Sequence, residues 1–203
     1  MKVSVVDATQ NPVEVCSLAA GICYGKQTAT EKRVANCVKM GHTSILEHAK
    51  FTLRVEGISR ACMAQLTRHR MASFCVESQR YNRYDLSGND WYVVPEAFTE
   101  EKLVGDFMLE SWYGKMMENA AANYRRALDE GIKPEDARYL LPEATKTNLF
   151  VTMNARELFH FLDMRADKAA QWEIRELAYA IMDALHDYSE GWRFLIDLYK
   201  SLE

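Results

Sequence analysis

Residues that interrupt regular structure are scarce in this sequence, and long apolar runs are missing. The 203 residues include 9 Gly and 4 Pro, against 48% hydrophobic and 11% aromatic residues. That composition excludes a low-complexity or disordered chain. No stretch approaches the roughly 20 apolar residues that a membrane-spanning helix needs, and the first residues lack the apolar core of a signal peptide. We therefore expect a globular cytoplasmic protein that does not contact membranes.

The cysteines form no pattern that indicates disulfides or a structural metal. There are five, an odd number, scattered over the first 75 residues without a Cys-x-x-Cys pair. Free thiols in a reducing compartment are the expected state. The motif His-Glu-x-x-His is absent, and His42 and His48 flank Glu47 without the spacing of helical metal ligands. We expect no metal site.

Glycine-rich nucleotide motifs and an excess of positive charge are also missing. The sequence holds no Gly-x-Gly, so it has neither a dinucleotide-binding fingerprint nor a phosphate-binding loop. The net charge of −4 argues against general binding to nucleic acids or anionic membranes.

Hydrophobic periodicity predicts one mixed α/β domain over residues 1–203, rich in helix, with a few strands that pair non-locally. Strands are expected at 2–6, 51–55, 91–94 and 150–153. Helices are expected at 13–21, 29–40, 58–67, 100–130 and 154–172, with Asn154 as the cap of the last one. A further short helix is expected to be capped by Ser44 and Glu47. Gly131 is expected to end the longest helix.

One segment departs from the acidic average of the chain. Residues 60–84 hold five arginines against a single glutamate, Glu77; the arginines are Arg60, Arg68, Arg70, Arg80 and Arg83. Crowded cations need an anionic or acceptor-rich partner if they are ordered, and guanidinium groups suit phosphates and imide edges. A solvated basic face is the alternative, but apolar residues on both sides of Arg68-His69-Arg70 favour the binding site.

A second candidate is Arg165. If 154–172 were one helix, one side of it would carry Asn154, Leu158, Phe161, Arg165 and Trp172, with Arg156 and His160 nearly opposite. Arg165 would then be either a snorkelling side chain or a paired, functional one. Periodicity alone leaves both interpretations open.

These residues resemble the flavin-dependent thymidylate synthases in several collinear blocks. Arg68-His69-Arg70 followed after seven residues by Ser78 reproduces the motif of that family. Similar blocks occur at 41–48 and 57–67 on one side, and at 137–142, 154–158, 161–167 and 170–174 on the other. The likeness covers nearly the whole chain.

The resemblance implies a fold, a reaction and its cofactors. The fold would be a helix-rich α/β arrangement around antiparallel strands, of the thymidylate synthase complementing type and without a Rossmann motif. The reaction would methylate dUMP to dTMP, with 5,10-methylenetetrahydrofolate as methylene donor and NADPH-reduced FAD as hydride source. The family works as a homotetramer with active sites shared between subunits.

The resemblance also assigns roles to individual residues. Arg165 and Ser78 would be catalytic, and Arg165 would stabilise the ionised uracil ring. FAD would be bound by Ser44, Arg68, His69, Arg70, Asn154, Arg156 and His160. The nucleotide would be bound by Gln65, Arg68, Glu77, Ser78, Gln79, Arg80, Arg138 and Arg165.

The segment after Ser73 departs from the family. Where the family commonly has Asn-Glu, this chain has Cys75-Val76, followed by Glu77. Either Glu77 supplies the lost polar contact or the backbone amide of Val76 does. His160 stands where a neutral amide also occurs in the family, so its role would depend on pH. A nucleotide- or RNA-binding homologue with impaired catalysis is therefore the alternative to an active enzyme.

Overall fold

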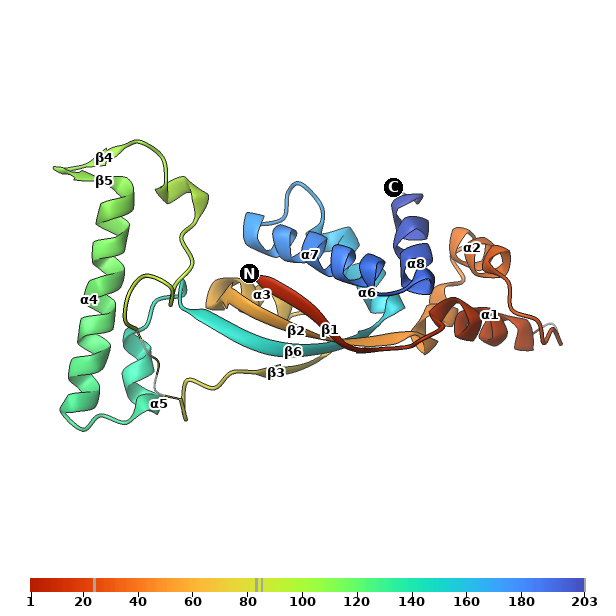
Figure 1. The fold of residues 1–203 in the computed structure, drawn as a ribbon, viewed down its shortest axis with the longest axis horizontal. Helices are drawn as coiled ribbons and strands as arrows, with labels where there is room; N and C mark the ends of the chain where they lie inside the picture. The colour runs from red at the N-terminus through yellow and green to blue at the C-terminus, as the bar shows by residue number, and fades with distance from the viewer. Residues whose placement is uncertain (24, 83, 85, 203) are drawn as a thin grey trace. The chain divides into compact units, whose positions relative to one another are not determined.

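The computed structural model describes residues 1–23, 25–82, 84 and 86–202, so Arg83 lies outside the described residues. Figure 1 shows the elements. The strands are β1 (Lys2–Ala8), β2 (Lys50–Ser59), β3 (Ser73–Val76), β4 (Leu103–Val104), β5 (Phe107–Met108) and β6 (Lys146–Asn154). The helices are α1 (Pro12–Ile22), α2 (Glu31–Lys39), α3 (Arg60–Leu66), α4 (Leu109–Asp129), α5 (Pro134–Ala137), α6 (Ala155–Arg165), α7 (Trp172–Tyr188) and α8 (Glu190–Lys200). Short 3₁₀ turns are η1 (Thr43–His48), η2 (Glu96–Phe98) and η3 (Arg138–Leu140).

The chain divides into two compact units. Unit 1 comprises residues 1–56, 65–75 and 149–203, and unit 2 comprises residues 57–64 and 76–148.

The main sheet has four strands in the order β1-β2-β6-β3. β1 and β2 are antiparallel, with Val3 opposite Val55 and Val5 opposite Leu53. Phe51, Leu53 and Val55 are buried while Arg54 is exposed, which confirms the alternation predicted from the sequence.

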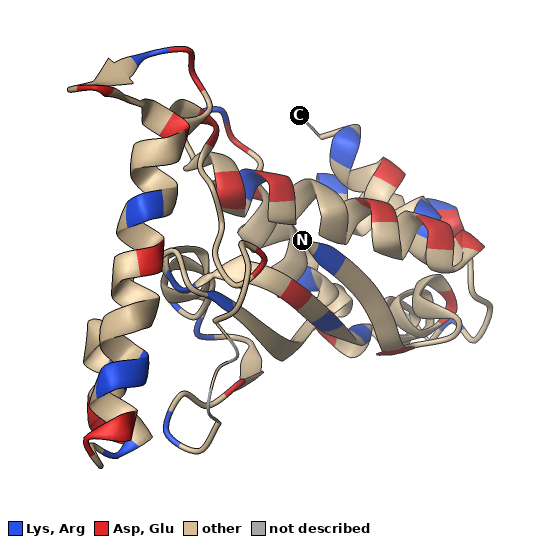
Figure 2. Cartoon of the chain, turned by 60° about the vertical axis from the view of Figure 1, so that its left-hand side comes forward, with Lys and Arg blue, Asp and Glu red and all other residues tan. Residues whose placement is uncertain are grey.

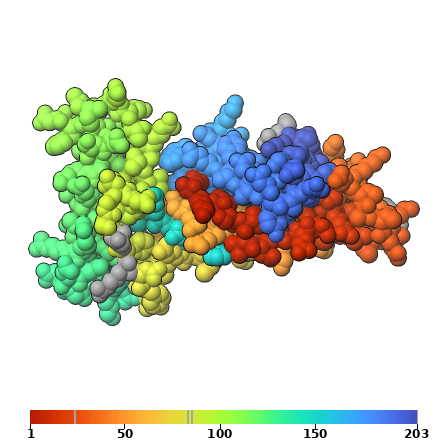
Figure 3. Space-filling model, in the orientation of Figure 1, coloured from red at the N-terminus to blue at the C-terminus, as the bar shows by residue number. Residues whose placement is uncertain are grey.

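Unit 1 joins the two ends of the chain in one core. α7 packs along β1, and α8 packs against both α7 and α1. Figure 3 shows the red N-terminal segment against the blue C-terminal helices. Trp192 of α8 is fully buried: its indole N–H donates to the Thr9 carbonyl (3.0 Å), and the Phe51 ring meets it edge-on at 5.3 Å.

Unit 2 is built around α4. Its buried face, with Tyr113, Met117 and Tyr124, packs with Trp91 and Tyr92 into a separate core. Basic and acidic residues are interspersed along the outside of α4 (Figure 2). Gly131, at φ 84°, follows the last turn of this helix as predicted.

The helix-rich fold with a small antiparallel sheet was correctly predicted, but several boundaries were wrong. The helix predicted over 100–130 begins at Leu109, because residues 103–108 form the β4–β5 hairpin around Gly105 (φ 60°). The helix predicted over 154–172 ends at Arg165, and Trp172 opens α7, so these two residues do not share one helix. Residues 58–59 belong to β2 instead of a helix, and in 91–94 only Tyr92 forms a bridge, with Thr145.

The turn at residues 43–48 also differs from the expectation. It is a 3₁₀ turn that follows His42, without a side-chain cap, so Ser44 and Glu47 form no capping box. β3 was not predicted.

Across residues 1–23, 25–82, 84 and 86–202, none of the helices has both the length and the apolar character that crossing a membrane requires.

Replacement of Trp192 tests the core of unit 1. W192A should lower the free energy of unfolding by about 3–5 kcal/mol, because it removes the ring and opens a cavity. W192F keeps a ring and loses the hydrogen bond, so we expect a loss of about 1–2 kcal/mol. Urea unfolding measures both, with exposed Ile22 replaced by Ala as the control that changes stability little. A loss below about 1 kcal/mol for W192A would contradict this packing.

Candidate active site

His69 is the centre of the candidate site in unit 1. It is only 4% exposed, and each ring nitrogen has one partner on α6. Nδ1 lies 3.2 Å from Oε1 of Glu157, which is itself 6% exposed, and Nε2 accepts a hydrogen bond from Nε of Arg165 at 3.0 Å. The ring of Phe161 packs against the imidazole at a centroid distance of 5.0 Å. His69 thus joins Glu157 and Arg165, which lie on the same helix, in one hydrogen-bonded row.

Local structure explains why His69 points inward while its neighbours do not. The turn after α3 is held by the amides of Arg68 and His69, which donate to the carbonyls of Gln65 and Leu66. In that turn His69 is buried, whereas Arg68 and Arg70 are exposed.

α6 begins at the predicted cap. Asn154 Oδ1 accepts a hydrogen bond from the Glu157 amide at 2.9 Å. In a capping box the acid at this position bonds back to the cap amide; here the Glu157 carboxylate contacts His69. The N-terminal end of the helix dipole favours its negative charge.

The pKa of His69 is lower than that of an ordinary histidine. Burial is the main cause, since it disfavours the charged imidazolium. The hydrogen bond to Glu157 opposes this shift, and the positive charge of Arg165 adds to it. His69 is therefore neutral at pH 7.

Two neighbouring cavities of unit 1 adjoin this row. The larger, of about 490 Å³, is lined by Arg68, His69, Arg70, Met71, Glu157, His160, Met164 and Arg165. The smaller, of about 410 Å³, is lined by Glu47, Met71, Asn154, Arg156, Glu157 and His160. Six of the seven residues predicted to bind FAD thus line these two cavities. The seventh, Ser44, lies with His42 at another cavity of unit 1, of about 500 Å³.

Positive charge dominates the larger cavity. Three arginines line it together with the single carboxylate of Glu157. In the smaller cavity the exposed guanidinium of Arg156 pairs with Glu47, a residue that the sequence did not predict as a ligand. Guanidinium and amide donors around an apolar Met71 suit a group that combines phosphates with a flat, acceptor-edged ring. The residues present therefore fit a flavin dinucleotide.

The same residues include a possible metal-ligand set. The donor atoms of His69, Glu157 and His160 lie within 4.8 Å of one another. Both nitrogens of His69 are already engaged, however, and the Arg165 guanidinium places a positive charge beside them. A cation would have to displace Arg165, so this arrangement favours an electron-rich ligand over a metal.

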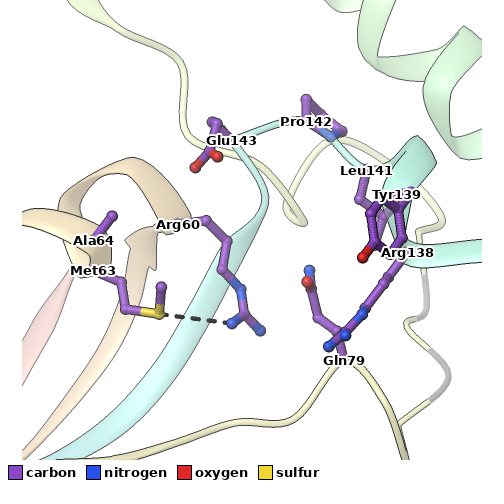
Figure 4. A pocket seen from close by; sticks show the side chains of 9 residues that line it. All are labelled: Arg60, Met63, Ala64, Gln79, Arg138, Tyr139, Leu141, Pro142 and Glu143. Carbon is purple, nitrogen blue, oxygen red and sulfur yellow. Dashed lines mark hydrogen bonds between the residues drawn. The ribbon is translucent and has the colours of Figure 1, made fainter. Parts of the chain in front are cut away.

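Unit 2 contains a different cavity, of about 460 Å³. It is lined by Arg60, Met63, Ala64, Gln79, Arg138, Tyr139, Leu141, Pro142 and Glu143. In Figure 4, Arg60 and Gln79 reach towards the same space from opposite sides, and Arg138 borders it. Two of the residues predicted to bind the nucleotide, Gln79 and Arg138, therefore share this cavity.

Glu135, which the sequence did not single out, contacts two arginines of unit 2. Glu135 Oε2 accepts a hydrogen bond from Nε of Arg80 at 2.7 Å, and the Glu135 carbonyl accepts one from Nε of Arg138 at 2.9 Å. Glu135, on α5, thereby orients Arg80 and Arg138, which are both predicted nucleotide ligands.

Three other residues were predicted to bind the nucleotide, and each has different surroundings: Ser78, Glu77 and Gln65. Ser78 closes a turn, since its Oγ accepts from the Arg80 amide. The Glu77 carboxylate accepts from the Asn148 side chain at 3.0 Å, and its carbonyl accepts from Arg60. Gln65, half-buried on α3, belongs to unit 1.

A family model described as thymidylate synthase complementing protein matches residues 4–188. The chain belongs to this family. A flavin-dependent thymidylate synthase of Pyrococcus furiosus is 38% identical over 197 residues, covering 91% of this chain and 79% of that protein. One from Geobacter sulfurreducens is 41% identical over 189 residues, covering 88% and 79%. The resemblance inferred from the sequence is confirmed.

A solved structure shares the fold. The crystal structure of thymidylate synthase X from Helicobacter pylori with FAD and dUMP has a TM-score of 0.77 with this chain. The two are 28% identical, and the match covers 98% of this chain and 99% of that one. The predicted fold class is therefore correct.

The lowered pKa of His69 makes stability depend on pH. Below the ordinary histidine pKa of about 6.5 the unfolded chain binds a proton that the folded chain excludes, so stability is lost as pH falls. H69Q removes this contribution. We expect a shallower decline in the urea midpoint of H69Q from about pH 7.5 to about pH 5.5, whatever its absolute stability. Equal slopes would contradict the buried, neutral state of His69.

Proposed function

We propose that this protein is a flavin-dependent thymidylate synthase that methylates dUMP to dTMP. 5,10-Methylenetetrahydrofolate is the proposed methylene donor, and NADPH is the proposed reductant of FAD. The observation that carries the proposal is the row Glu157–His69–Arg165 beside a cavity lined by three arginines, in a chain of this family.

FAD is proposed to bind in unit 1. Arg68, Arg70 and Arg156 supply charge-assisted donors for its phosphates and ring edge, with Asn154, His69 and His160 around them and Ser44 at the neighbouring cavity. When bound and reduced, FAD supplies the hydride that completes the methyl group. The protein itself supplies binding, orientation and exclusion of water.

Arg165 is proposed to activate the substrate. A guanidinium beside the uracil N3 lowers the pKa of that nitrogen and stabilises the ring anion, which makes C5 the electron-rich carbon that must bond to the methylene group. No cysteine nucleophile is needed. Burial raises the pKa of the Cys16 thiol to about 11, which makes it a poor nucleophile.

Unit 2 is proposed to bind the nucleotide phosphate and sugar. Arg138 and Gln79 line its cavity, and Arg80 is oriented by the same glutamate as Arg138. Ser78 and Glu77 are proposed as further ligands in unit 2. The family resemblance also implies Arg68 and Gln65 as nucleotide ligands. Glu77 would have to leave Asn148 to serve in that role.

The domain organisation, the oligomeric state and the cellular location of the protein also stay predictions. We propose that residues 1–203 act as one domain, that the protein is a cytoplasmic homotetramer, and that its active sites are shared between subunits. All five cysteines, each within the described residues, are free, which supports a reducing compartment.

The visible spectrum of the purified protein tests the flavin proposal. A yellow protein whose flavin absorbance changes on addition of dUMP supports it, and tritium release from 5-tritiated dUMP with NADPH and methylenetetrahydrofolate tests turnover. A colourless protein that still binds dUMP would favour the impaired homologue, for which Val76 in place of an acid is the specific observation.

The role of Arg165 is tested by R165A. We expect kcat to fall at least about 100-fold, the effect typical of removing a group that stabilises developing negative charge. Bound FAD should stay near one per chain, because the other arginines remain. R126A, which removes an exposed arginine of α4, is the matched control and should leave both values unchanged. Full turnover by R165A would exclude the proposed role.

A further inference from the structure

Glu157 is a buried carboxylate that no part of the proposed chemistry uses. Its Oε1 lies 3.2 Å from Nδ1 of His69, and its backbone amide is held by the Asn154 cap. A buried carboxylate costs free energy unless a donor faces it. Its conformation is therefore fixed at both ends.

The bond between Arg165 and His69 shows which tautomer of the imidazole is present. A guanidinium can only donate, so Nε2 of His69 at 3.0 Å from Nε of Arg165 must carry a lone pair. In a neutral ring the proton is then on Nδ1, where the Glu157 carboxylate accepts it. Burial, which lowers the pKa of His69, keeps the ring neutral despite the nearby carboxylate.

The groups that face His69 agree with this assignment. They are Glu157, Arg165 and His160 from α6, and His160 meets the ring at a centroid distance of 5.9 Å. The Phe161 ring packs on the imidazole and restricts its rotation. A ring flip would place the Nδ1 proton against a guanidinium that cannot accept it.

We propose that Glu157 is a positioning residue for Arg165 and acts through the tautomer of His69. Its carboxylate holds the proton on Nδ1, so Nε2 can anchor Nε of Arg165. The terminal N–H groups of Arg165 are then the ones that a ligand in the 490 Å³ cavity meets. Anchoring a long side chain in advance avoids its entropy cost when the ligand binds. This inference rests on the proposed function only for the identity of that ligand.

The exposed end of α6 makes such an anchor necessary. Arg165 is the last residue of α6 and is only half-buried. Without His69 its guanidinium would sample several rotamers at a helix end. The hydrogen bonds of His69 to Glu157 and Arg165 therefore link the last turn of α6 to its first turn.

The tautomer can be measured directly in the full-length, flavin-loaded protein. Nitrogen-15 NMR of labelled histidines distinguishes a protonated Nδ1 from a protonated Nε2, and the H69Q variant identifies the His69 signal. We expect Nδ1 protonated and Nε2 unprotonated at neutral pH. The opposite tautomer, or a doubly protonated ring, would overturn the proposal even if the enzyme is active.

E157Q tests the link to Arg165. An amide can either accept from or donate to Nδ1, so the His69 signal should move towards a mixture of tautomers. We expect kcat with dUMP to fall about 10- to 100-fold, the range found when the partner that orients a metal-ligating histidine is lost, with bound FAD nearly unchanged. E176Q, at an exposed glutamate on α7, is the matched control and should match wild type.

Each remaining outcome also decides the proposal. E157Q with wild-type kcat, or with a reduced kcat but the wild-type tautomer, would overturn it, because a merely structural glutamate would lower kcat without moving the proton. If E157Q does not fold, the wild-type tautomer still supports or refutes the assignment. If the wild-type protein binds FAD but shows no turnover, the proposed function fails while the NMR result stands.

Discussion

The hydrogen bonds on both sides of one buried imidazole organise the candidate site. His69 lies between a carboxylate and a guanidinium that are eight residues apart on α6, and it comes from a turn nearly ninety residues earlier in the chain. Because both of its ring nitrogens are hydrogen-bonded, the imidazole is held in one orientation where it lines the cavity. The flanking arginines, Arg68 and Arg70, can then be exposed without losing their position, since the turn that buries His69 carries them.

The two units contribute different kinds of anion recognition. In unit 1, guanidinium groups surround an apolar methionine and a neutral imidazole, which suits a flat ring with polar edges. In unit 2, Glu135 orients two arginines, one of which lines the cavity, and this arrangement suits a phosphate. In unit 1 the Glu157 carboxylate contacts His69, which in turn accepts from Arg165. In unit 2 Glu135 accepts from Arg80 through its carboxylate and from Arg138 through its backbone carbonyl.

Sequence patterns predicted the family, the helix-rich fold and the alternation of β2, because these depend on local periodicity and on collinear motifs. Asn154 was also found as a helix cap from local chemistry alone. The contact of Glu157 with His69 could not be predicted, because an acid three residues after a cap is expected to bond to the backbone. The break after Arg165 was missed because residues 166–171 favour helix and the next cap is Gln171. The β4–β5 hairpin, by contrast, had a signal in Gly105-Asp106 between apolar residues.

A crystal structure of the full chain with FAD and dUMP bound tests the central claim most directly, because it shows which group the anchored guanidinium meets. We expect His69 to remain between Glu157 and Arg165, the flavin to lie against Arg68 and Arg70, and the terminal nitrogens of Arg165 to contact the imide edge of the uracil. A structure in which Arg165 has left His69, or in which neither ligand touches the 490 Å³ cavity, would contradict the account.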